Sequence, residues 1–312
     1  MTDLSGDDRN GFARPAPMER GFNHLIAGGH FERKFGRWPL PPNDAAATIN
    51  DLIFARMINP NWSALQRTFV DKGTAKAMAT RSCPALRVLE TLAVIPMAGV
   101  RSVDRLHELL RPFIGTPAIA KPTHASGSPV FLRNVTSPAD LAAMHQLASI
   151  DYALVMREMQ YWNLPRQIIV ETLVPAHNSA PPDDYKFHCI HGEPLLCQVD
   201  HARFGTAWSR LFQVPGFEPM DADDGFTTPE DYWLPDAGRL AEMTAAARAL
   251  AAPFDFVRVD LYDGADGIYF GELTFTPAAS LGIAPSSAGC HRETPTHREY
   301  SRTLMRAFRR EG

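Results

Sequence analysis

The sequence has few cysteines, no long apolar run and no excess of charge of one sign. Cys83, Cys189, Cys197 and Cys290 are widely spaced and form no CxxC pair, which argues against a zinc site or a disulfide framework. We expect reduced cysteines that pack as small apolar residues. No apolar segment is long enough to cross a bilayer, and the start MTDLSGDDRNG is polar. These absences predict a cytoplasmic protein with no membrane partner.

Charge is nearly balanced, with 31 basic and 35 acidic residues and a net charge of -4 at pH 7. Domains that bind nucleic acid usually carry a basic surplus, so no nucleic-acid partner is expected. The apolar content of 45% is ordinary for a globular protein, and 312 residues leave room for two or three subdomains. The sequence does not indicate an oligomeric state.

The pattern of apolar residues predicts a helical N-terminal part followed by an α+β body whose strands pair largely as hairpins. Residues 1–43 are rich in glycine, proline and charge, and predict an arm with a short helix near 24–30. Further helices are expected over 44–59, 71–81, 102–110, 137–159 and 237–253. Strands are expected over 87–96, 116–122, 130–135 and 166–174, and hairpins over 184–204 and 256–277, with an irregular excursion over 214–235.

The hairpin over 256–277 is the most informative segment. Its runs FVRVDLY and IYFGELTF alternate with period two around an Asp/Gly-rich turn. Asp260 and Glu272 can therefore project from the same sheet face, where two dehydrated carboxylates need a compensating cation. Because Mg²⁺ is usually held by one or two carboxylates plus a nucleotide, the pair predicts a magnesium site and phosphoryl chemistry. The alternative is an amphipathic hairpin whose acids face water.

Lys121 ends an apolar strand and is followed by the small-residue loop THASGSP. A lysine and a loop of this kind can place an ammonium and backbone N–H groups around phosphate oxygens. A lysine before a turn is also commonplace, so this feature gains weight only from the residues downstream.

The order of these features resembles the ATP-grasp superfamily, and most closely its TupA-like branch, which is associated with teichuronopeptide and polysaccharide biosynthesis. The segments PDDYKFHCIHGEPL and FVRVDLYDGADGIYFGELTFTP carry the resemblance, which covers about residues 70–285. It implies an α+β ATP-grasp fold in which two α+β subdomains sandwich ATP, preceded by a mostly helical N-terminal region. The expected divisions are an arm (1–43), an N-terminal helical and α/β subdomain (44–117), a small subdomain with the phosphate loop (118–175) and a C-terminal subdomain with the metal site (176–312).

The resemblance also implies roles for single residues. It predicts ATP contacts from Lys72, Lys121, His124, Ala125, Ser126, Gly127, Ser128, Glu171, Thr172, Leu173, Val174, Asp184 and Lys186. Catalytic cations are expected at Lys186, Arg203 and Arg258, and Mg²⁺ ligands at Asp260, Glu272 and Thr274. Relatives commonly have Asn at the position of Thr274, so a site with two carboxylates is favoured over one with three ligands.

Several of these residues have ordinary structural alternatives. Lys72 can be a solvated residue at a helix start, and Glu171 an ordinary acid at a strand end. Asp184 and Lys186 can form a local salt bridge. His188 and His201 are further candidates for the substrate site.

The function implied is an ATP- and Mg²⁺-dependent ligase, which joins a small-molecule carboxylate to an amine or another nucleophile through an acyl phosphate. Two alternatives stay open: a kinase of the same fold that phosphorylates a small molecule or sugar, and a non-catalytic nucleotide-binding protein of a polysaccharide pathway. Loops at 23–43, 204–235 and 278–295 are expected to select the substrates.

Overall fold

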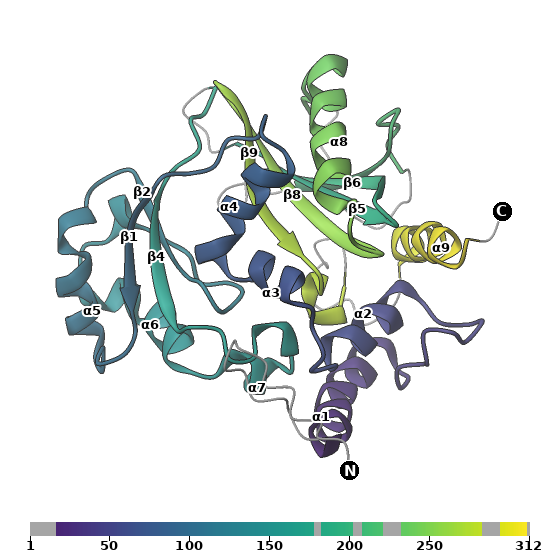
Figure 1. The fold of residues 1–312 in the computed structure, drawn as a ribbon, viewed down its shortest axis with the longest axis horizontal. Helices are drawn as coiled ribbons and strands as arrows, with labels where there is room; N and C mark the ends of the chain where they lie inside the picture. Colours follow the sequence, from purple (N-terminus) through teal and green to yellow (C-terminus); the bar gives the residue numbers. More distant parts are fainter. Residues whose placement is uncertain (1–16, 178–181, 202–207, 221–231, 283–293, 311–312) are drawn as a thin grey trace, which may run out of the picture.

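The computed structural model describes residues 17–177, 182–201, 208–220, 232–282 and 294–310. Two antiparallel sheets lie beside each other, with helices between them and around them (Figure 1). The mixture of helices and antiparallel sheets is the predicted α+β class. Arg203 and Cys290 lie outside the described residues. Within the described ranges, no helix is both long and apolar enough to cross a membrane.

The first sheet has four strands in the order β1-β4-β2-β3. They are β1 (Thr91–Pro96), β2 (Ala118–Pro122), β3 (Val130–Phe131) and β4 (Gln167–Thr172). Ala120 and Val170 point into a core against α5 (Val103–Leu110) and α6 (Ala142–Ser149). Because side chains alternate along a strand, Lys121 and Glu171 point to the opposite face, toward the second sheet.

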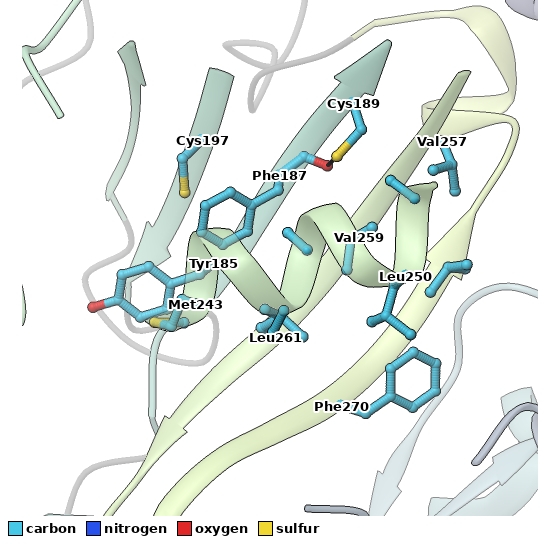
Figure 2. Packing of buried hydrophobic residues seen from close by; sticks show 14 of the residues in the cluster. Tyr185, Phe187, Cys189, Cys197, Met243, Leu250, Val257, Val259, Leu261 and Phe270 are labelled. Carbon is cyan, nitrogen blue, oxygen red and sulfur yellow. Dashed lines mark hydrogen bonds between the residues drawn. The ribbon is translucent and has the colours of Figure 1, made fainter. Parts of the chain in front are cut away.

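The second sheet has five strands in the order β7-β6-β5-β8-β9. They are β5 (Asp184–Ile190), β6 (Glu193–His201), β7 (Trp208–Gln213), β8 (Phe256–Gly264) and β9 (Gly267–Thr274). One face packs against α8 (Ala237–Ala251), and Figure 2 shows Phe187, Val259 and Leu250 among the side chains of this core. The other face carries polar residues at alternate positions, as the period-two pattern predicts.

The remaining helices join the two sheets and close the far end of the second one. They are α1 (Pro17–Phe35), α2 (Ile49–Met57), α3 (Ala64–Val70), α4 (Lys72–Ser82), α7 (Tyr152–Met156) and α9 (Pro295–Arg309). Helices α3 and α4 lie between the sheets, whereas α2 and α9 pack together at the end of β5 and β6 that is distant from the first sheet (Figure 1).

The helix predicted over 137–159 is wrong as a single element. The chain forms 3-10 turns at Pro138–Leu141 and Met159–Tyr161, with α6 and α7 between them. Ile150 is extended, with φ -93° and ψ 162°, and the Asp151 carboxylate accepts a hydrogen bond from Leu154 N at 3.3 Å. The break is therefore a helix end followed by a new N-cap.

Other boundaries also differ from the prediction. Helix α1 is longer than the short helix predicted near 24–30, and β3 gives way to a 3-10 turn at Leu132–Asn134. The elements α3, β7 and α9 were not predicted. The predicted division between 117 and 118 falls between β1 and β2, which belong to one sheet. The domain divisions themselves stay a prediction.

Candidate active site

A cleft of about 290 Å³ lies between the two sheets. One wall comes from β2, β3 and β4, the other from β5, β6, β8 and β9, and helices α3 and α4 close one side. Part of the lining is apolar and includes Val70, Leu89, Ile119, Phe131, Leu173, Val174 and Phe270. The rest consists of charged side chains of both signs, which is the composition expected for a ligand with an apolar ring and an anionic group.

Glu171 is the centre of a three-residue ion-pair cluster on the first wall. Its carboxylate lies 2.7 Å from Lys76 Nζ and 2.6 Å from Lys121 Nζ, and its side chain is only 3% exposed. Burial raises the pKa of Glu171, but Lys121 and Lys76 outweigh it, so the pKa lies below its ordinary value and the group is ionised at neutral pH. Lys76 was not predicted, although it lies four residues after Lys72 and so on the same helix face.

Lys72 connects α4 to the predicted phosphate loop. Its Nζ donates a hydrogen bond to Ala125 O at 2.8 Å and lies 6.0 Å from the centre of the Tyr161 ring. Burial lowers the pKa of this lysine, and the nearby Glu272 carboxylate opposes that effect. Lys72 is therefore not a solvated residue at a helix start.

The predicted phosphate loop is buried in its first half and open to the cleft in its second. Thr123, His124 and Ala125 are buried, and Thr123 N donates to Gln167 O at 2.9 Å. Ser126 and Gly127 line the cleft. Gly127 has a φ of 96° and Ser128 a φ of 51°, so the backbone reverses there in the left-handed region. Only the second half is placed to cover a ligand.

The strand after Glu171 contributes two of the three predicted contacts. Leu173 and Val174 line the cleft. Thr172 does not, because its backbone N donates to Glu90 O and its hydroxyl accepts from Glu90 N. Its side chain therefore joins β4 to the segment before β1.

The acidic hairpin forms the second wall. Asp260 pairs with Glu272 and Arg258 with Thr274 across β8 and β9, which confirms that these side chains share one face. The Arg258 guanidinium donates two hydrogen bonds to the Asp260 carboxylate, of 2.7 and 2.6 Å, and a third to the Thr274 hydroxyl at 3.2 Å. Burial raises the pKa of Asp260 to about 6, although Arg258 acts in the opposite direction. Arg258 is thus the cation that compensates the buried acid.

The carboxylates of Asp260 and Glu272 fit a magnesium ion that is shared with a bound phosphate. Asp260 and Glu272 supply the carboxylate oxygens that Mg²⁺ prefers, and this ion commonly completes its shell with water and phosphate oxygens. In the part of the chain that the structure describes, no three His, Cys, Asp or Glu residues gather as a metal site. The pair therefore fits an ion shared with a bound phosphate rather than one enclosed by protein, with the Thr274 hydroxyl, which donates to Glu272 at 3.2 Å, beside it.

Lys186 lies between two acids that line the cleft, although its own side chain is not among the lining residues. Its Nζ is 2.9 Å from Asp184 and 2.5 Å from Asp200. Burial lowers the pKa of Lys186, but Asp184, Asp260 and Asp200 together raise it above its ordinary value. Asp200 also accepts hydrogen bonds from Ser209 and Gln198. It was not predicted, although it faces Asp184 directly in the β5–β6 hairpin.

The two candidate histidines do not line the cleft. His188 is fully buried with its Nδ1 2.8 Å from the Tyr300 hydroxyl, and burial holds its pKa well below the usual value. His201 Nδ1 lies 2.7 Å from Asp183, and its ring stacks on Trp208. Both side chains are instead held by partners outside the cleft lining, His188 by Tyr300 and His201 by Asp183.

A buried carboxylate that was not predicted joins the segment before β4 to the end of β9. Glu158 accepts hydrogen bonds from the Tyr152 hydroxyl at 2.8 Å, the Thr276 hydroxyl at 2.7 Å and the Gln160 amide at 3.1 Å. Burial raises its pKa. This network fixes the chain two residues beyond Thr274.

Two sheets that enclose a cleft with lysines on one wall and paired acids on the other define the ATP-grasp fold. The sequence profile of the TupA-like ATPgrasp family matches residues 88–286, and the chain belongs to this family. The match ends before α9 and begins after α4, so it covers both sheets. The predicted family is confirmed. No curated protein matches the chain.

Several solved structures are similar to the chain. The ATP-grasp ligase PsnB complexed with its minimal precursor is 13% identical, with a TM-score of 0.37, over 78% of this chain and 63% of that one. The D-alanine–D-alanine ligase from Bacillus anthracis is 16% identical, with a TM-score of 0.37, over 78% and 69%. N5-carboxyaminoimidazole synthase from Aspergillus clavatus is 11% identical, with a TM-score of 0.37, over 69% and 46%. The chain thus spans about half to two thirds of the length of these proteins.

Proposed function

We propose that this protein is an ATP- and Mg²⁺-dependent ligase that joins a carboxylate to an amine, or to another nucleophile, and forms ADP. The observation that carries the proposal is the division of charge across one cleft. Lys121 lies on the first wall and Lys72 on α4 at the side of the cleft, whereas Asp260 and Glu272 lie on the second wall. Phosphates between these walls would meet ammonium groups on one side and a carboxylate-bound cation on the other.

The nucleotide base would occupy the apolar part of the cleft. Leu173 and Val174 follow Glu171 at the end of β4, where their backbone groups can meet an adenine edge while Ile119 and Phe270 contact its faces. The phosphates would then lie near Lys72 and Lys121, under Ser126 and Gly127. In this placement the adenine ring contacts apolar side chains and the phosphates lie beside lysine ammonium groups.

The reaction would proceed in two steps at the phosphate end of the cleft. A substrate carboxylate oxygen attacks the γ-phosphorus of ATP and ADP leaves, giving an acyl phosphate. An amine nitrogen then attacks the acyl carbon, phosphate leaves, and the C–N bond is formed. Arg258 and Lys186 stabilise negative charge beside the transferred group, and residues 126–129 exclude water. Asp260 and Glu272 would hold Mg²⁺, which when bound would neutralise negative charge on the phosphates.

Four further assignments belong to this proposal. Arg203 would add a cation near the transferred phosphate, and Asp184 would contact the nucleotide directly or through Lys186. The association of the TupA-like branch with teichuronopeptide and polysaccharide biosynthesis supports a role in peptide or polysaccharide modification, for which we propose a cytoplasmic location. The segments 23–43, 204–235 and 278–295 would determine the carboxylate and the amine; the structure shows that the first includes the end of α1 and the second includes β7.

The first experiment is isothermal titration of the protein with a non-hydrolysable ATP analogue, with and without Mg²⁺. We expect micromolar binding that requires Mg²⁺ and that Glu272→Gln weakens at least about tenfold, which is about 1.4 kcal/mol. Glu242→Gln is the matched control, because this side chain is 65% exposed on α8. No binding under any condition would disprove the nucleotide site.

Hydroxylamine trapping then separates the ligase from a kinase, because only an acyl phosphate yields a hydroxamate. Carboxylates are screened for ADP release, and active ones are repeated with hydroxylamine. Unchanged turnover in the variant with both Asp260→Asn and Glu272→Gln would refute the assigned roles of the two acids.

A further inference from the structure

A cavity of about 450 Å³ lies at the start of α8, apart from the cleft. Its described lining residues are His177, Trp233, Pro235, Asp236, Arg239 and Asp263. Tyr262 lines the cleft and Asp263 is the next residue along β8, so the Asp263 side chain points to the opposite face of the sheet, which α8 covers (Figure 1). The cavity and the cleft share no described lining residue. The volume is ordinary for a small-molecule site, which typically has about 300–1,000 Å³.

Asp263 supplies this cavity with a buried carboxylate whose hydrogen-bonding capacity is only partly used. Its side chain is 6% exposed, Oδ2 accepts from His177 Nε2 at 3.2 Å, and Oδ1 lies 3.0 Å from Arg239 Nε. That ion-pair contact lacks hydrogen-bond geometry, and Oδ1 accepts no hydrogen bond from the described part of the chain. Because buried carboxylate oxygens normally have a donor, a ligand in this cavity that donates to Oδ1 completes the group.

Trp233 supplies the same cavity with an exposed aromatic ring. This residue is 62% exposed, whereas the neighbouring Tyr232 packs against Trp208 and Phe212. The centre of the Trp233 ring lies 6.5 Å from that of His177, with 63° between the two planes. The indole therefore offers an apolar face close to the polar groups around Asp263.

The charges of the cavity favour a neutral ligand. Two carboxylates, Asp236 and Asp263, line it together with one guanidinium, Arg239. A cationic ligand lies beside the arginine and an anionic ligand beside the acids, so either one meets a like charge. A hydroxyl group has neither problem, because it can donate to a carboxylate and accept from a guanidinium. The cavity thus matches a ligand with several hydroxyls and one apolar face.

We propose that this cavity binds a neutral pyranose sugar with equatorial hydroxyls. The axial C–H bonds of such a ring form an apolar face that lies on the Trp233 indole, and the hydroxyls at its edge reach Asp263 and Arg239. Asp236 accepts a hydrogen bond from Arg239 N at 3.0 Å as the N-cap of α8, which fixes the backbone of Arg239 at the cavity. This inference is independent of the proposed ligase activity, because it needs neither ATP nor Mg²⁺.

The test is saturation-transfer difference NMR of the full chain with methyl β-D-glucopyranoside, whose hydroxyls are all equatorial. We expect saturable binding with a Kd of about 1 mM, which is usual for a ligand of this size. Trp233→Ala should weaken binding at least about tenfold, and Trp233→Phe, which keeps an aromatic face, less than about threefold. Asp263→Asn removes the charged acceptor and should also cost about tenfold.

The matched control is Trp38→Ala, which removes another exposed tryptophan. Trp38 is 41% exposed, stacks on His24 of α1 and does not line the cavity. This variant should bind the sugar as the wild type does. Thermal melts check each fold. If Asp263→Asn unfolds, the comparison of Trp233→Ala with Trp38→Ala still decides the question, because the Trp233 side chain is exposed and lies outside the core.

Three outcomes would overturn the proposal. The first is no saturable transfer from the protein to the glucoside at tens of millimolar sugar. The second is an equal loss of affinity in Trp38→Ala and Trp233→Ala, which would mean that the sugar contacts exposed aromatic rings without a specific site. The third is tighter binding of tetramethylammonium or of methyl β-D-glucuronide than of the neutral glucoside. That result would identify a site for a charged ligand and not for a neutral sugar.

Discussion

Replacing Glu171 with glutamine removes the one carboxylate that both Lys76 and Lys121 contact. Glutamine has the same size as glutamate and keeps one of its two side-chain oxygens, so packing against β2 is preserved. What is lost is the negative charge between two ammonium groups at 2.7 and 2.6 Å. The two lysines then repel each other across a neutral amide in a partly buried site.

The magnitude follows from the burial of the three groups. Removing one partner of a buried ion pair typically costs about 3–5 kcal/mol. Here the acid is 3% exposed but Lys76 and Lys121 are 15% and 24% exposed, so water reaches the ammonium groups. We therefore expect the lower end, about 3 kcal/mol. Lys76→Met leaves the Lys121 contact in place and should cost only about 1 kcal/mol.

Urea unfolding followed by circular dichroism at several pH values measures this cost. The pKa of Glu171 is lowered in the folded protein, so its contribution is complete above the ordinary value of 4.5 and is lost as the pH falls through the folded value. The difference between the wild type and Glu171→Gln should therefore be largest at pH 7 and should shrink below about pH 4.5. Glu90→Gln, at an exposed acid before β1, is the control and should have little effect.

Two results would refute this reasoning. One is a Glu171→Gln protein as stable as the wild type at pH 7, which would mean that the ion pairs barely offset their desolvation. The other is a larger loss for Lys76→Met than for Glu171→Gln, because the cluster would then not be centred on the acid.

The remaining predictions concern the loop and the hairpin. Burial and Arg166 lower the pKa of His124 to about 4, so stability should fall as the pH drops below its ordinary value of 6.5; at pH 5 the loss is about 2 kcal/mol. His124→Gln should remove it in urea titrations, and an unchanged pH profile would contradict the assignment. A Cβ on Gly271 would lie 2.8 Å from Asp260 O, so Gly271→Ala should cost about 1–3 kcal/mol in thermal melts. Gly29→Ala, with open space around it, is the control, and equal melting temperatures for the two variants would argue against the clash.

Local pattern was sufficient to predict every strand of both sheets except β7, and the shared face of Asp260 and Glu272. Alternation of apolar and polar residues fixes which side chains face one way, and hairpin turns fix which strands are neighbours. The helix that begins after Ser102 was also predicted from local sequence. The structure confirms the cap, because the Ser102 hydroxyl accepts a hydrogen bond from Arg105 N at 3.2 Å. In each case the determining contacts lie close together in sequence.

Contacts between distant segments were not predictable in this way. Glu158 meets Thr276 across 118 positions, and nothing near Glu158 in sequence indicates that partner. Helix α9 has a helical pattern of apolar residues, but its place against β5 depends on contacts such as Tyr300 to His188. The break at Ile150, in contrast, has a local signal that the sequence analysis missed, because Asp151 is the N-cap of α7 and accepts a hydrogen bond from Leu154 N.

The hydrogen bonds of Glu158 also limit how the cleft can open. Glu158 belongs to the segment that leads into β4, whereas Thr276 continues the strand that carries Glu272 and Thr274. A rotation of the first sheet away from the second must therefore either drag the end of β9 with it or break a buried hydrogen bond. Any movement between the two sheets is therefore coupled to the position of the acidic strand, and a ligand that drew the sheets together would also move Glu272.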